Sequence, residues 1–168
     1  MNLATFVKTQ PNNIAIDWNK AEDELGFILH KNIKDFYSRT FGKCIKGRVN
    51  FTTDKFLKKT DNEKFDNWFA FNKCEGIVEV EFYPLERKNI IETLKATFFD
   101  WTGGNDFGHR ALIGTFYMNI GQILILINND TGKVEWIDCG YGYFDVYEQN
   151  PNGILADTIT ELLEKFSY

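Results

Sequence analysis

The sequence predicts an α+β fold, with a mostly antiparallel sheet flanked by an N-terminal helix pair, a middle helix and a C-terminal helix. Apolar residues with helical spacing open and close the chain, and strand-type runs of apolar residues concentrate in its second half. Residues typical of tight turns join those runs. With 168 residues, 43% of them hydrophobic, the chain suits a single domain with a core of its own.

Two short helices are expected near the N-terminus, over residues 18–25 and 31–40. Asp17 is a suitable N-cap for the first, and Gly26 stands where a C-terminal cap belongs. The second helix should end at Gly42, and its apolar side consists of Ile33, Phe36 and Tyr37. The tight connection FILHKN predicts that the two helices pack as neighbours.

The segment from residue 43 to 75 leaves alternatives open. RVNFTT predicts a strand in which Val49 and Phe51 share a face. Residues 61–73 place four aromatic rings close together, and this pattern fits either a helical face or an aromatic strand.

Residues 77–83 predict a strand with one wet face, because Glu79 and Glu81 alternate with apolar residues and Pro84 stops the run. A helix is then expected from Asn89 to Trp101, with apolar residues spaced to face a core. The Gly-Gly pair at 103–104 should break it.

The last third holds most of the strand pattern. ALIGTFYM, QILILI and KVEWID are candidate strands, and NNDTG between the last two reads as a hairpin turn. ILILI has no polar alternation, which predicts a central strand covered on both faces. LADTITELLEKF predicts a closing helix, since Thr158 and Glu161 have capping-box spacing.

Charge is distributed unevenly along the chain. Residues 1–99 carry 16 Lys or Arg and 14 Asp or Glu, whereas residues 100–168 carry 3 and 10. This polarity favours a basic partner for the C-terminal half or an acidic one for the basic segment 31–64, and two solvated surfaces of opposite sign would also explain it. Direct nucleic-acid binding is not expected as the main role, because the chain is acidic overall and shows no recognised nucleic-acid-binding motif.

Cysteines and histidines give no metal-binding pattern. The three cysteines are widely spaced, no Cys-x-x-Cys pair occurs, and only two histidines are present. We therefore expect no metal and no cofactor, with free thiols in a reducing cytosol. The N-terminus lacks the features of a secretory signal and ILILI is far too short to span a membrane, so a soluble cytoplasmic protein is expected.

Three stretches together resemble the SUKH superfamily, which includes Smi/Knr-like and Syd-like proteins and many bacterial immunity proteins. The first is WNKAEDELGFILHKNIKDFYSRTFG, in which Glu24-Leu25-Gly26 and Leu29 fit the family pattern and His30 stands where proline is usual. The second is ILILINNDTGKVEWID, and the third is LADTITELLEKF. The resemblance covers both ends of the chain, with extra residues between 43 and 110.

The resemblance implies an α+β scaffold that binds another protein without catalysis. It implies an immunity protein that neutralises a bacterial toxin, often a nuclease, by occluding its active cleft. The alternative is a Syd-like or Smi-like regulator that binds a host protein. We expect a monomer or weak dimer in either case.

Enzyme motifs are sparse. DFGHR contains the letters DFG without the other kinase motifs, and no nucleophile elbow, phosphate loop or dinucleotide fingerprint occurs. The loop Gly103-Gly104-Asn105-Asp106 could bind an anion, although a helix-ending loop explains it better. A small enzyme in which His109 acts as a base beside Asp106 is therefore the third hypothesis.

The segment from residue 138 to 148 is the main candidate for partner binding, because it crowds tyrosines and carboxylates together without lysine or arginine. Tyrosines are suited to anchor an interface, and carboxylates around them would steer a basic partner. The wet strand face is a second acidic and aromatic candidate, and a solvated sheet edge would explain both. The candidate partner-binding residues are Asp138, Tyr141, Tyr143, Asp145, Tyr147 and Glu148, with Glu79 and Glu81 on the strand face.

Overall fold

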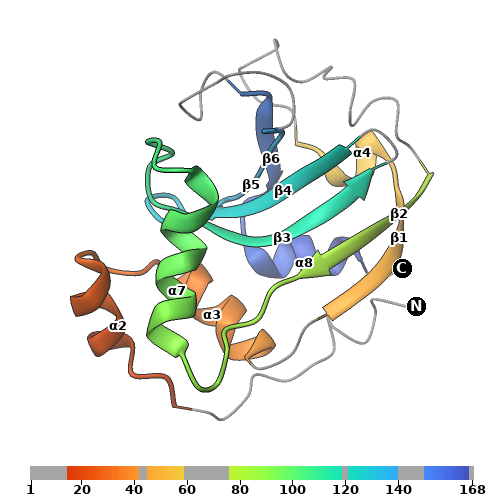
Figure 1. Cartoon of the computed structure of the whole chain (residues 1–168). Coiled ribbons are helices and arrows are strands. Elements are labelled where there is room, and N and C mark those ends of the chain that lie inside the picture. The colour runs from red at the N-terminus through yellow and green to blue at the C-terminus, as the bar shows by residue number, and fades with distance from the viewer. Residues whose placement is uncertain (1–14, 42–44, 59–75, 119–120, 140–149, 167–168) are drawn as a thin grey trace.

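Six antiparallel strands form one sheet in the computed structural model, which describes residues 15–41, 45–58, 76–118, 121–139 and 150–166 (Figure 1). The strands are β1 (Ile45–Phe51), β2 (Gly76–Phe82), β3 (Arg110–Met118), β4 (Gly121–Asn128), β5 (Val134–Ile137) and β6 (Asn152–Ala156). The helices are α2 (Trp18–Leu25), α3 (Lys31–Thr40), α4 (Thr53–Phe56), α7 (Ile90–Phe99) and α8 (Ile159–Lys165), with a 3-10 turn η1 (Asp100–Thr102) after α7. The predicted α+β fold is confirmed.

The sheet follows the chain order β1-β2-β3-β4-β5-β6, so every strand pairs with its neighbour in the sequence. β3 carries an irregularity between Leu112 and Gly114. A Cβ atom on Gly114 would lie 2.4 Å from the main-chain oxygen of Glu81 on β2. Glycine at this position therefore lets β2 and β3 approach closely.

One face of the sheet forms the main core with α3 and α8. Alternate residues of β1 and β2, such as Val49 and Val80, point into it, and the apolar side of α8 packs against them. Phe56 of α4 contributes a ring that lies 4.9 Å from the Phe51 ring and 5.5 Å from the Phe166 ring. The core is therefore rich in aromatic side chains, and α8 lies behind the sheet as Figure 1 shows.

The described residues cover the opposite face only in part. Phe107, Leu126 and Ile137 form a second apolar cluster there, with Trp101 packed against it. Leu126 is fully buried although it faces away from the main core, so ILILI is covered on both faces around this residue, as predicted. Over β2 and the C-terminal half of β3, no described helix lies on this face (Figure 1).

The helix pair has the predicted bounds and caps. Oδ1 of Asp17 accepts a hydrogen bond from the Lys20 N–H at 3.1 Å, and Gly26 ends α2 with φ +83°. His30, where proline was expected from the resemblance, is the N-cap of α3, because its Nδ1 accepts from the Asn32 N–H at 3.1 Å. α3 ends at Thr40, and Gly42 lies outside the described residues.

The closing helix is capped as its sequence predicts. The Glu161 N–H donates to Oγ1 of Thr158 at 3.1 Å, and the Glu161 carboxylate accepts the Asp157 N–H at 2.9 Å.

The middle helix is shorter than predicted, because α7 ends at Phe99 and continues as η1 to Thr102. The ambiguous residues 61–73 lie outside the described residues, and neither α4 nor β6 was predicted.

Candidate functional site

The acidic and aromatic segment 138–148 is described only at its first two residues. Tyr141, Tyr143, Asp145, Tyr147 and Glu148 lie outside the described residues, so their role in binding stays a prediction. Asp138 is only 5% exposed, and its N–H donates to the Pro151 carbonyl at 2.9 Å. Its carboxylate is therefore not part of an exposed acidic surface.

The second candidate, the wet face of β2, carries ion pairs with β1. Glu79 lies opposite Arg48 and Glu81 lies opposite Lys46 in the antiparallel register. Arg48 Nη2 is 3.4 Å from Glu79 Oε1, and Lys46 Nζ is 3.1 Å from Glu81 Oε1. The two carboxylates therefore form an alternating charge ladder with β1 and not a bare acidic patch.

Tyrosine side chains from β3 and the end of β2 continue this polar face. The Tyr117 hydroxyl donates to Oε2 of Glu81 at 2.8 Å, and the Tyr83 hydroxyl shares a 2.6 Å hydrogen bond with Thr115. The hydrogen bond to Glu81, with burial as the second cause, raises the pKa of Tyr117 above its ordinary value of 10.0. The Tyr117 hydroxyl therefore keeps its proton, and stays a donor, above the pH at which an ordinary tyrosine ionises.

We call the side chains of Lys46, Arg48, Glu79, Glu81 and Tyr117 the strand face. These residues line a shallow hollow of ≈ 300 Å³. The outer pair of Glu79 and Arg48 is more than half exposed, whereas Glu81 is largely buried. Ile77, on the same face of β2, is 67% exposed. The strand face can thus offer charge of both signs, a phenol ring and an apolar side chain to a partner.

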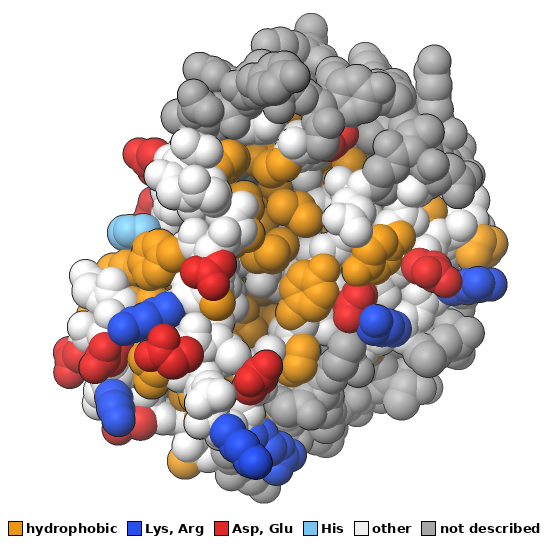
Figure 2. Space-filling view, viewed as in Figure 1, with side chains coloured by type: hydrophobic (Ala, Val, Ile, Leu, Met, Phe, Trp, Pro, Cys, Tyr) orange, Lys and Arg blue, Asp and Glu red, His pale blue; other side chains and the backbone are white. Residues whose placement is uncertain are grey.

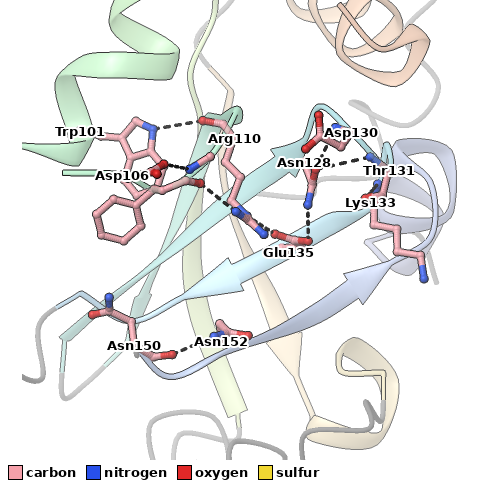
Figure 3. Close-up of polar contacts among 12 residues, drawn as sticks. Trp101, Asp106, Arg110, Asn128, Asp130, Thr131, Lys133, Glu135, Asn150 and Asn152 are labelled. Atoms are coloured by element: carbon pink, nitrogen blue, oxygen red, sulfur yellow. Dashed lines mark hydrogen bonds and ion pairs between the residues drawn. The ribbon is translucent and has the colours of Figure 1, made fainter. Parts of the chain in front are cut away.

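A polar network behind the loop after α7 was missed by the sequence reasoning (Figure 3). Arg110 at the start of β3 donates through Nε to Oε2 of Glu135 on β5 at 2.7 Å, and Asn128 Nδ2 donates to the other Glu135 oxygen at 3.0 Å. Arg110 Nη1 also donates to the Phe107 carbonyl, and Trp101 Nε1 donates to the Arg110 carbonyl. The alternation in KVEWID correctly predicted that Glu135 lies on the face opposite Trp136. It did not predict that Glu135 pairs with Arg110.

The link between the α2–α3 connection and the β4–β5 turn is built by side-chain amides. Oδ1 of Asn129 accepts the His30 N–H at 2.8 Å, and its Nδ2 donates to the Ile28 carbonyl at 2.8 Å. Asn32 Nδ2 donates to the Gly132 carbonyl at 2.8 Å. Two of the stretches that carry the SUKH resemblance, about a hundred residues apart, are therefore joined directly.

His109 and Asp106, the residues of the enzyme hypothesis, lie in the same loop. The His109 ring stacks on Phe27 with 4.0 Å between ring centroids and an interplanar angle of 11°. Oδ1 of Asp106 accepts the Gly108 N–H at 2.9 Å. Each side chain thus has a contact that organises the loop itself.

No family model, curated protein or solved structure matches this chain. Within the described part of the chain, no helix combines the length and apolar character needed to cross a membrane.

Proposed function

We propose that this chain is a cytoplasmic, non-enzymatic protein-binding module of the SUKH type that acts as an immunity protein and neutralises a basic bacterial toxin. The toxin class that fits best is a nuclease, because its active cleft must attract phosphate and so carries positive charge. An inhibitor that presents carboxylates and tyrosines would occupy such a cleft.

The observation that carries this proposal is the part of the sheet left uncovered by the described helices. Antiparallel sheets commonly leave one face to solvent, and such a face is typical of an interaction surface where exposed apolar and aromatic groups gather on it. Figure 2 shows hydrophobic side chains gathered on this face beside charged ones of both signs. The strand face therefore has the mixed composition of an interface.

Scaffold contacts support the SUKH assignment within the proposal. The helix pair and the NNDTG turn are joined through Asn129 and Asn32, and α8 packs on the same sheet. The three stretches that carry the resemblance thus belong to one packed unit.

The proposal is tested by capturing the partner from the cells that make this chain and expressing that partner alone. A basic protein whose expression arrests growth, and whose toxicity is relieved by co-expression of this chain, would support the proposal. Capture of a resident protein without toxicity would instead indicate a regulator. A substrate turnover catalysed by the chain itself would contradict a non-enzymatic role.

A charge reversal on the strand face localises the binding. Glu79→Lys places a positive charge beside Arg48 and should weaken capture of a basic partner about tenfold, equivalent to about 1.4 kcal/mol. The double variant Arg48→Glu with Glu79→Arg keeps the cross-strand pair in reversed order and controls for folding. An affinity that neither variant changes would exclude the strand face as the interface.

A further inference from the structure

One residue, Asn129, joins three segments that are distant in the sequence. Besides its side-chain hydrogen bonds to His30 and Ile28, its N–H donates to the His109 carbonyl at 2.8 Å. Asn129 itself is buried. The α2–α3 connection, the loop after α7 and the β4–β5 turn therefore meet at one place, which we call the Asn129 junction.

A row of aromatic rings lies on the junction, with Phe99 and His109 exposed and Phe27 half-buried. Phe27 stands at its centre, stacked on His109 and edge-on to Phe99 with 6.5 Å between ring centroids. Phe99 is 47% exposed and Ile28 is 74% exposed. Among the described residues only three large hydrophobic side chains are exposed to this degree, and two of them are here. Such a concentration marks an apolar contact surface.

A hollow of ≈ 350 Å³ opens beside the row. Its lining includes Phe99 and His109 from the row and the acidic residues Asp106 and Asp130. None of its lining residues, all within the described part of the chain, is a lysine or arginine. Arg110, which follows the loop, directs its guanidinium to Glu135 and the Phe107 carbonyl. The hollow therefore combines aromatic rings with two acidic residues, Asp106 and Asp130, and no lysine or arginine among its lining residues.

We propose that the Asn129 junction is a docking surface for a basic protein, and that the hollow receives an arginine side chain of that protein. A guanidinium is planar, stacks on aromatic faces and pairs with carboxylates, whereas a lysine ammonium is a compact, strongly hydrated charge. Phe99 supplies an apolar contact in the lining, and the exposed Ile28 adds apolar surface elsewhere on the junction. The inference rests on the proposed function, because the occupant belongs to the same basic partner.

The junction is preorganised for this role. Trp101 Nε1 donates to the Arg110 carbonyl at 3.2 Å, Arg110 Nη1 to the Phe107 carbonyl at 2.8 Å, and the Gly108 N–H to Asp106. These bonds hold the loop between α7 and β3 in one conformation. Because little has to be ordered on binding, more of the contact energy contributes to affinity.

The direct test is a titration of the isotope-labelled full chain with N-acetylarginine amide, followed by amide chemical shifts. N-acetylcitrulline amide, which has the same shape without the charge, is the matched probe. We expect saturable shifts at the residues that line the hollow and binding about tenfold weaker for citrulline. Equal binding of both probes, shifts confined to other surfaces, or no shifts would overturn the inference.

Variants separate this inference from the proposed function. Asp106→Asn with Asp130→Asn keeps an acceptor for Gly108 and should weaken both arginine binding and partner capture about tenfold. Asp54→Asn with Glu92→Gln removes the same charge elsewhere and should leave both unchanged. Partner capture unaffected by the first pair would reject the docking site but not the function. A chain that captures no toxic partner yet still binds arginine would reject the function alone.

Discussion

The buried pair between Arg110 and Glu135 gives the sharpest stability prediction. Glu135→Gln preserves the shape of the side chain and its acceptor for Asn128, but it removes the charge that faces Arg110 Nε at 2.7 Å. The side chains of Arg110 and Glu135 are only 14% and 9% exposed, so solvent screens the pair weakly. Removing one partner of a buried pair typically costs about 3–5 kcal/mol.

The cost expected for Glu135→Gln is at the lower end, about 3 kcal/mol, because Arg110 keeps its bond to the Phe107 carbonyl. Replacing both partners with apolar residues, as in Arg110→Met with Glu135→Leu, leaves no unpaired charge. That double variant should cost about 1–2 kcal/mol, chiefly because Asn128 loses an acceptor. The two substitutions should thus be strongly non-additive.

Urea unfolding followed by far-ultraviolet circular dichroism measures these differences, with tryptophan fluorescence as a second probe of the same transition. The wild type, Arg110→Met, Glu135→Leu and the double variant that combines them complete a cycle that isolates the coupling. A cost below about 1 kcal/mol for Glu135→Gln, or single effects that simply add in the double variant, would refute the view that the pair is a coupled buried unit.

Three further predictions concern the scaffold. Gly114→Ala should cost about 3 kcal/mol of unfolding free energy, because its Cβ would lie 2.4 Å from the Glu81 main-chain oxygen. Gly104→Ala should cost only about 1 kcal/mol in the same urea assay, because a Cβ there meets no atom within 4 Å and only the φ of +84° is unfavourable. Thr158→Ala should cost about 1 kcal/mol and Thr158→Ser almost nothing, since the hydroxyl caps α8; equal losses in thermal unfolding would contradict this. Burial raises the pKa of Tyr37 above its ordinary value of 10.0, so the protonated phenol stabilises the fold below that pH and this contribution is lost as pH rises toward the folded-state pKa. Tyr37→Phe should therefore flatten the decline of unfolding free energy at alkaline pH, and an unchanged dependence of unfolding free energy on pH would refute the assignment.

Local patterns in the sequence were sufficient for the helix ends and the strand faces. Asp17, Gly26 and Thr158 act through neighbours only a few residues away, so their caps follow from spacing alone. The alternation around Glu79 and Glu81 likewise predicted which face of β2 is wet. These elements were confirmed because nothing distant in the chain overrides them.

Partners across strands could not be predicted in this way. Glu135 on β5 pairs with Arg110 on β3 only because both strands flank β4 in a fixed register. Glu79 likewise meets Arg48, which compensates the charge that the sequence alone presents as acidic. The Asn129 junction depends on three segments whose proximity no local pattern encodes.

The five predicted partner-binding residues from Tyr141 to Glu148 lie outside the described residues and stay untested.

The meander order of the sheet has a consequence for how the chain acquires its structure. Each strand pairs with the next one along the chain without any crossover, and the connections from β3 to β4 and from β4 to β5 are short, so the entropy lost in loop closure is small for this part of the sheet. The bonds from Asn129 to Ile28 and His30 close a far longer loop. Attachment of the helix pair should therefore be a late folding event, and the arginine-binding end would be completed only once the rest of the molecule is in place.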